Sequence, residues 1–227
     1  PKDLDEALST KIPDLLCLSN YSWNFRLAYK FAQLAKEKKP DLIIVMGGPN
    51  YPLDEEKKVD FLKKNHLIDF YISNEGEEGF VDLLRKLKNN NLDAKIIKSK
   101  EESIINCEYL HEGRLIQGAN KRIEDLDLIP SPYTSGVLDD FFNLSLIPLF
   151  ETNRGCPFAC TFCSDGIDFK SRVFRYSEAR TAQTLEYISK KIMEDNYNYI
   201  STSNQHILLY NISLPIPIPS YNSNKHP

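Results

Sequence analysis

Short apolar runs alternate with helix-period segments through residues 14–88. This alternation restricts the possible folds more than any other feature, because strands that alternate with helices form βα units with a parallel sheet. We expect strands at 14–19, 41–46 and 67–73, and helices at 25–38, 59–64 and 77–88. The run 41–46 is almost continuously apolar, which is typical of a strand covered on both faces. The sequence therefore predicts an α/β fold.

The second half of the chain carries different signals. Alternating runs in 104–117 flank the turn residues 111–114 and predict a β-hairpin. Residues 126–133 contain two prolines and predict an extended connector. After it we expect a strand at 145–152 and a helix at 177–194, with Ser177 as its N-cap.

Three cysteines lie within eight residues, Cys156, Cys160 and Cys163. Clustered thiolates favour iron-sulfur clusters, zinc or copper(I) over hard cations, and one loop can give a cluster three ligands while leaving one iron open. A closed zinc site needs a fourth ligand, for which only Cys107 and His111, about 50 residues upstream, are available. A disulfide framework is disfavoured because the cysteine count, five, is odd and no secretory segment begins the chain. We expect the solitary Cys17 and Cys107 to pack in the core.

The cysteine spacing, the Gly-Cys-Pro opening at 155–157 and the aromatic Phe162 resemble the radical S-adenosylmethionine (SAM) superfamily, whose signature is C-x3-C-x2-C. The resemblance implies that Cys156, Cys160 and Cys163 hold a 4Fe-4S cluster whose open iron binds SAM. In that family the cluster donates one electron, SAM is cleaved to a 5′-deoxyadenosyl radical, and the radical takes a hydrogen atom from the substrate. The resemblance also implies that Phe162 shields the cluster or flanks the adenine.

Two residues just before the cysteine loop are further candidates. Asn153 and Arg154 follow the strand expected at 145–152, and active sites of βα barrels gather at the carboxyl ends of strands. By the resemblance they hydrogen-bond the cluster sulfides or the cofactor carboxylate. A surface ion pair is the alternative for Arg154.

The first part of the chain resembles the cobalamin-binding-type domain that precedes the radical barrel in a large subgroup of this superfamily. The points of match are Leu18-Ser19 with Tyr21 and Trp23, Gly47-Gly48-Pro49, and Glu75-Gly76-Glu77 with Phe80. The resemblance implies that Ser19, Gly47 and Gly48 line a groove for the corrinoid tail at the carboxyl edge of the sheet. The Asp-x-His-x-x-Gly element that supplies a lower cobalt ligand in other cobalamin proteins is absent. Cobalamin bound without a histidine ligand and an empty structural relic both remain open.

The resemblance also predicts the domain organisation. Residues 1–100 form a Rossmann-like, parallel-sheet, cobalamin-binding-type domain that is truncated at its start, and 101–143 form the hairpin and the proline-containing linker. Residues 144–210 begin a radical SAM barrel, and the proline-rich tail 211–227 is expected to be disordered. Only 64 residues follow Cys163, whereas a barrel needs about 200 in all. Residues 201–204 stand where the family has Gly-Gly-Glu, so we expect an incomplete barrel that does not sustain turnover alone.

The function implied is therefore that of a radical SAM enzyme, or a fragment of one, acting on an unknown substrate. The resemblance implies an external electron donor of the flavodoxin or ferredoxin type. A non-catalytic iron-sulfur or zinc module is the alternative, and a methylthiolating enzyme of nucleic acid is disfavoured because those relatives carry three further cysteines where this chain has only Cys17. The net charge of −4 predicts neither a nucleic-acid nor a membrane partner, and the reduced-thiol chemistry favours the cytoplasm.

Overall fold

The computed structural model describes residues 2–10, 12–142, 146–163 and 166–195, and the chain divides into two compact units, 1–124 and 125–227. This division falls inside the segment 101–143 that the sequence assigns to hairpin and linker, and the domain boundaries remain a prediction. The sequence also predicts a strand at 197–201. That strand, the segment 201–204 and the tail 211–227 lie outside the described residues.

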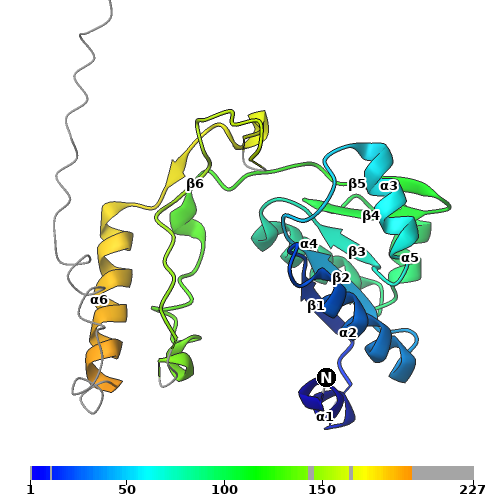
Figure 1. The fold of residues 1–227 in the computed structure, drawn as a ribbon, viewed down its shortest axis with the longest axis horizontal. Coiled ribbons are helices and arrows are strands. Elements are labelled where there is room, and N and C mark those ends of the chain that lie inside the picture. Colours follow the sequence, from blue (N-terminus) through cyan, green and yellow to red (C-terminus); the bar gives the residue numbers. More distant parts are fainter. Residues whose placement is uncertain (1, 11, 143–145, 164–165, 196–227) are drawn as a thin grey trace, which may run out of the picture. The chain divides into compact units, whose positions relative to one another are not determined.

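The first unit is built on a five-stranded sheet with the order β1-β2-β3-β4-β5 (Figure 1). The strands are β1 (Leu15–Ser19), β2 (Ile43–Gly47), β3 (Phe70–Ile72), β4 (Cys107–His111) and β5 (Arg114–Gln117). The first three are parallel, whereas β4 and β5 form the expected hairpin and join β3 in antiparallel orientation. The predicted α/β class is confirmed, with a mixed sheet because the hairpin extends the parallel strands.

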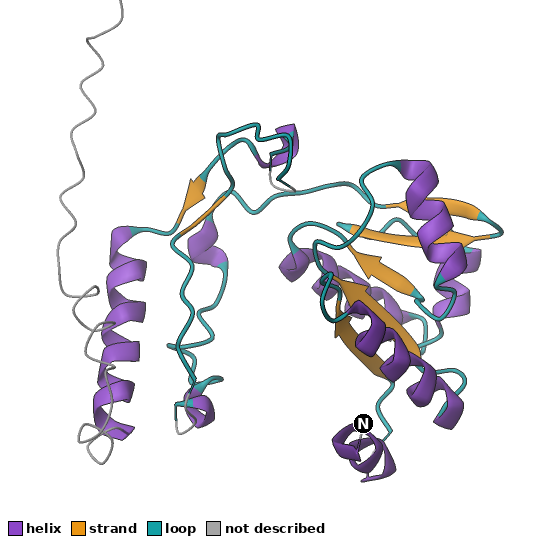
Figure 2. Ribbon diagram, in the orientation of Figure 1, coloured by secondary structure: helices purple, strands orange, loops and turns teal. Residues whose placement is uncertain are grey.

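Helices cover both faces of this sheet (Figure 2). They are α1 (Lys2–Thr10), α2 (Phe25–Lys38), α3 (Glu55–Lys64), α4 (Gly76–Asn89) and α5 (Ala94–Ser99). Successive residues of β2 lie on opposite faces of the sheet. On one face, Ile43 and Val45 pack with α4 and α5. On the other face, Ile44 packs with α1 and α2, and Met46 packs with α2 and α3. Burial on both faces is the reason that this strand is continuously apolar.

Two local features differ from expectation. Helix α3 begins at Glu55, four residues earlier than expected, because the Asp54 side chain accepts a hydrogen bond from the Lys57 amide and caps the helix. Cys107 is buried as expected, but the expectation that Cys17 lies in the core is wrong. Cys17 is exposed because β1 is the edge strand of the described sheet.

The described part of the second unit contains less regular structure. Its elements are the 3-10 turns η1 (Leu126–Leu128), η2 (Asp139–Phe141) and η3 (Asp168–Lys170), the strands β6 (Asn153–Arg154) and β7 (Phe174–Arg175), and helix α6 (Glu178–Asp195). Helix α6 begins as predicted, since the Ser177 hydroxyl accepts a hydrogen bond from the Arg180 amide. The longer strand expected up to residue 152 is wrong: residues 146–152 are not a strand, and among the described residues β6 pairs only with β7.

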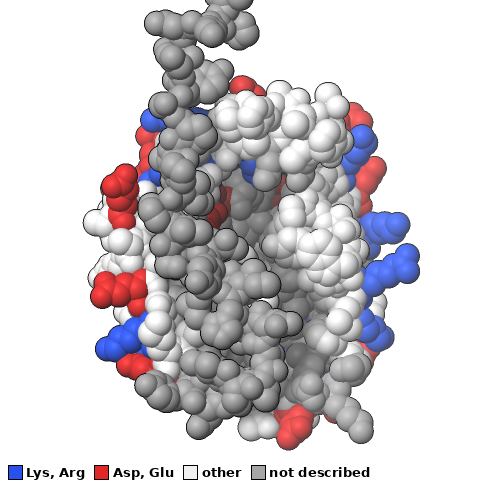
Figure 3. Space-filling model, turned by 60° about the vertical axis from the view of Figure 1, so that its left-hand side comes forward, with Lys and Arg blue, Asp and Glu red and all other residues white. Residues whose placement is uncertain are grey.

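Charge and apolar length also bear on possible partners. Acidic and basic side chains share the face drawn in Figure 3, in keeping with 28 basic and 32 acidic residues in the whole chain. Within the described ranges, no helix combines enough length with enough apolar character to cross a membrane.

Candidate functional site

The three residues expected to form the corrinoid groove lie together at one edge of the sheet. Ser19 and Gly47 are the last residues of β1 and β2, and the parallel register places them side by side. Gly48 follows directly. Because parallel strands end at the same edge, the loops after β1 and β2 begin next to each other, which is where open α/β sheets bind ligands.

Two buried side chains, those of Asn20 and Tyr71, join these two loops by hydrogen bonds. Asn20, the first residue after β1, is fully buried, and its amide nitrogen Nδ2 donates to the Asn50 carbonyl oxygen at 2.6 Å and to the Tyr71 hydroxyl at 3.0 Å. The Tyr71 hydroxyl donates to the Gly48 carbonyl oxygen at 2.7 Å. Asn50 returns a hydrogen bond to the Asn20 side-chain oxygen at 2.9 Å. We call Asn20, Gly48, Asn50 and Tyr71 the loop-spacing network.

The close approach of the two loops explains why residue 48 is glycine. The Gly48 backbone has φ of +129°, and a Cβ atom at this residue would lie 2.5 Å from the Asn20 carbonyl oxygen. Gly47 is less restricted, since its Cβ would lie 3.2 Å from the Ile72 carbonyl oxygen. The close approach at Gly48 is therefore made by the chain's own backbone.

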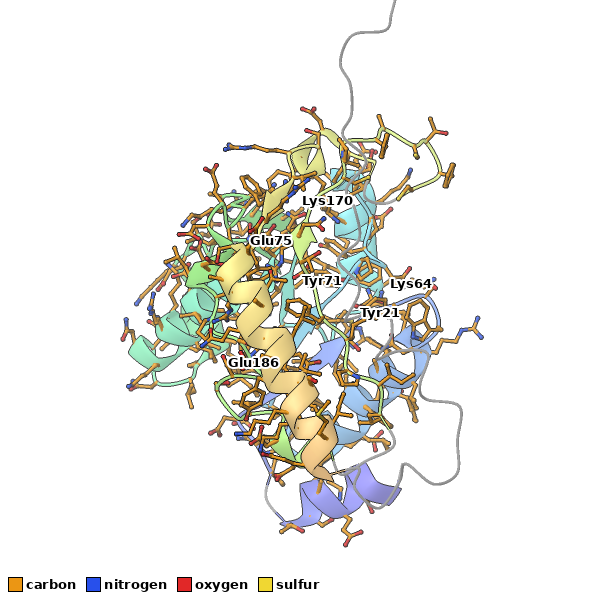
Figure 4. The ribbon with its side chains drawn as sticks, turned by 90° about the vertical axis from the view of Figure 1, so that its left-hand side faces the viewer. Tyr21, Lys64, Tyr71, Glu75, Lys170 and Glu186 are labelled. Atoms are coloured by element: carbon orange, nitrogen blue, oxygen red, sulfur yellow. The ribbon has the colours of Figure 1, made fainter. Side chains whose placement is uncertain are left out.

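Exposed groups at the same edge are available to a ligand. Ser19 is exposed, and its hydroxyl oxygen accepts a hydrogen bond from the Asn24 side chain at 2.7 Å. Tyr21 and Trp23 stack with ring centroids 4.6 Å apart, and Trp23 is 79% exposed. Tyr21 and the buried Tyr71 are both labelled in Figure 4. An exposed hydroxyl beside an exposed stacked aromatic pair suits a ligand with both polar and flat apolar parts.

Sequence reasoning missed Asn20 and Tyr71. Tyr71 lies 51 residues after Asn20 and looks like an ordinary aromatic residue of a buried strand. The one available signal was an asparagine directly after an apolar strand, because a polar residue that becomes buried there needs hydrogen-bond partners.

The cysteine loop begins immediately after β6. Gly155 has φ of +103°, and the Cys156 amide then donates to the Lys170 carbonyl oxygen at 2.9 Å. The Cys163 amide donates to the Cys160 carbonyl oxygen at 3.1 Å, which makes one tight turn between these two cysteines. A Cβ atom on Gly166 would lie 2.4 Å from the Cys160 carbonyl oxygen, so glycine allows the chain to return against the loop.

The thiols themselves are accessible. Cys160 and Cys163 are exposed and Cys156 is half-buried, and no disulfide is found in the described part of the chain. The described residues gather no group of three side chains that could hold a single metal ion. Three thiols on one short loop are donors that suit a soft metal or a soft-metal cluster.

Three further candidate residues lie just before the loop or within it. The Arg154 Nε atom lies 2.8 Å from a Glu151 carboxylate oxygen, so the alternative of a surface ion pair is realised. Asn153 is exposed and its side-chain oxygen accepts a hydrogen bond from the Thr152 hydroxyl. Phe162 is 91% exposed. Their roles toward a cluster or toward SAM remain predictions.

A pocket of about 400 Å³ adjoins β6 and the start of α6. It is lined by Thr152, Asn153, Arg175, Tyr176, Glu178, Thr181, Ala182 and Leu185. Asn153 is therefore the one predicted site residue that borders it.

Comparison with known proteins agrees with both resemblances. A 2-(S-pantetheinyl)-carbapenam-3-carboxylate methyltransferase from Streptantibioticus cattleyicolor is 33% identical over 189 residues, which are 81% of this chain and 26% of that protein. The cobalamin-dependent radical SAM methyltransferase TokK from Streptomyces tokunonensis is 31% identical over 194 residues, again 81% and 26%. No protein-family model matches the chain.

A solved structure supports the fold. The cobalamin-dependent SAM radical enzyme OxsB, determined with aqua-cobalamin and SAM bound, superposes with a TM-score of 0.61 at 21% identity and covers 86% of this chain and 26% of OxsB. The chain thus spans about a quarter of the length of these relatives. By sequence the chain is similar to part of the cobalamin-dependent radical SAM methyltransferase TokK, and by fold to part of OxsB.

Proposed function

We propose that the chain carries the cofactor-binding part of a cobalamin-dependent radical SAM methyltransferase whose substrate is unidentified. The observation that carries the proposal is the C-x3-C-x2-C loop, in a chain whose relatives include methyltransferases of that kind.

In this proposal Cys156, Cys160 and Cys163 hold a 4Fe-4S cluster and leave one iron open for SAM. When bound, the cluster supplies the electron that cleaves SAM, delivered by an external donor of the flavodoxin or ferredoxin type. The protein holds the cysteines on a loop fixed at its start by the hydrogen bond between Cys156 and Lys170. The exposure of Cys160 and Cys163 leaves room for the cluster and the cofactor.

We place the corrinoid tail at the carboxyl edge of the first sheet, against Ser19 and the loops that follow β1 and β2. Support comes from the parallel register of Ser19 and Gly47 and from the exposure of Ser19 and Trp23. The glycines act by letting the two loops approach each other.

Titration with hydroxocobalamin tests this placement. We expect a shift of its visible spectrum that saturates near one equivalent, and weaker binding by Ser19→Ala, which removes an exposed hydroxyl at small cost to stability. Ser99→Ala is the matched control, because Ser99 is an exposed serine at the end of α5 that bonds only to the Ile96 carbonyl oxygen. Equal affinity of both variants would place the ligand elsewhere.

The SAM site is tested by electron paramagnetic resonance of the reconstituted, dithionite-reduced chain. Addition of SAM should change the cluster signal, since SAM is proposed to bind the open iron. A signal that SAM leaves unaltered, with a full complement of iron and sulfide, would favour the alternative of a non-catalytic iron-sulfur module.

A further inference from the structure

We infer that Tyr71 is a positioning residue for the corrinoid groove: through its hydroxyl it sets the spacing between the loop after β1 and the loop after β2. The inference rests on the proposed function for the identity of the ligand. The spacing itself depends only on the chain's own contacts.

The hydroxyl of Tyr71 contacts both loops at once. It accepts from Asn20 Nδ2 at 3.0 Å and donates to the Gly48 carbonyl oxygen at 2.7 Å. A phenolic hydroxyl has one proton to donate and lone pairs with which to accept, so both roles are satisfied together. Burial raises the pKa of Tyr71, which keeps that proton in place at neutral pH.

The ring of Tyr71 is fixed as well as its hydroxyl. Tyr51, in the loop after β2, stacks on it with centroids 3.7 Å apart and planes 12° apart, and Phe61 of α3 meets it edge-on. Tyr71 is fully buried. Because the ring is packed on two sides, its hydroxyl has one fixed position. From that position the hydroxyl bonds to both loops.

Separation of the loops would leave buried polar groups without partners. Asn20 is fully buried and uses its side chain for Asn50 and Tyr71, and its backbone amide donates to the Gly47 carbonyl oxygen at 2.6 Å. Unpaired buried donors are costly, so the network favours a single spacing. A groove with a fixed width binds its ligand without first having to order its walls.

Tyr71→Phe is the direct test, because it keeps the ring and its stacking and removes only the oxygen. Tyr109→Phe is the matched control. Tyr109 is also a buried sheet tyrosine whose hydroxyl donates to a backbone carbonyl, that of Glu102 at 2.8 Å, but it packs in the core on the opposite face. Each variant thus loses the hydrogen bond that a buried hydroxyl donates to a carbonyl.

We expect Tyr71→Phe to weaken hydroxocobalamin binding about tenfold, and Tyr109→Phe to stay within about twofold of wild type, because only the first loosens the groove. Amide hydrogen exchange gives a readout that needs no ligand. The backbone amide hydrogens of Asn20 and Asn50 should exchange about tenfold faster in Tyr71→Phe than in Tyr109→Phe.

The outcomes separate the inference from the proposed function. Unchanged affinity and unchanged loop exchange in Tyr71→Phe overturn the inference. A wild-type chain that does not bind hydroxocobalamin contradicts the proposed ligand, and the exchange rates then decide by themselves whether Tyr71 sets the loop spacing.

Discussion

The position that a Cβ atom of residue 48 would occupy lies 2.5 Å from the carbonyl oxygen of Asn20. Any side chain at Gly48 therefore collides with the backbone of the loop after β1, whether or not a ligand is bound. Loss of cobalamin binding in a Gly48 variant would not by itself locate the groove, which is why Ser19→Ala and Tyr71→Phe are the better probes.

Gly48→Ala should be strongly destabilising. It forces a side chain into positive φ and into contact with Asn20, and we expect the free energy of unfolding to fall by about 2–4 kcal/mol. Gly113→Ala is the control, because Gly113 also has positive φ but its Cβ would meet nothing within 4 Å. Denaturant unfolding measures both, and equal losses would show that backbone strain alone, without the contact to Asn20, accounts for the effect.

A buried ion pair joins α3 to β4. The Lys58 Nζ and Glu108 Oε1 atoms lie 2.8 Å apart, and the Glu108 side chain is only 2% exposed. Lys58→Met should lower the unfolding free energy by about 3–5 kcal/mol, because it leaves a buried carboxylate without its cation. The double variant Lys58→Met with Glu108→Leu should recover most of that loss.

The exposed ion pair of Lys121 and Glu78 is the control for the Lys58 and Glu108 variants. Lys121→Met should cost about 0–1 kcal/mol, as solvent-exposed ion pairs do. A loss at Lys58 no larger than the loss at Lys121 would mean that water reaches Glu108 and that the pair is not buried in solution.

Acid should destabilise the start of α6. The Ser177 hydroxyl and its backbone amide, the latter at 3.0 Å, donate to the Asp127 carboxylate and hold the pKa of Asp127 below its usual range. A depressed carboxyl pKa contributes stability above the unfolded value, and that contribution is lost as the pH falls through the folded pKa. An NMR titration of Asp127 should therefore give a midpoint below that of an unperturbed aspartate. Ser177→Ala should raise this midpoint, and an unmoved midpoint would contradict the assignment.

Local patterns were sufficient to predict much of the first unit. Helix α2 has the predicted bounds Phe25–Lys38, and the hairpin turns at Glu112 and Gly113, where both residues have positive φ. The short helix Ala94–Ser99 was not predicted, because six residues give too little periodicity to detect.

What the sequence could not show depends on contacts between distant residues. Whether Cys17 is covered depends on the order of the strands in the sheet, and β1 lies at the edge of the described sheet. The bond between Asn20 and Tyr71 joins residues 51 positions apart. At the candidate site, residue types and spacing identified the cysteine loop and the strand ends, whereas the buried network between the strand ends required the structure.

The central claim is that Cys156, Cys160 and Cys163 together hold one four-iron cluster, and iron and sulfide analysis after anaerobic reconstitution tests it most directly. We expect about four iron and four sulfide per chain, as a three-cysteine 4Fe-4S site requires. Cys160→Ala should lose most of both, while Cys17→Ala, which removes an exposed cysteine from the other unit, should retain them. Stoichiometric zinc without sulfide, or the same iron content in Cys160→Ala as in Cys17→Ala, would contradict the claim.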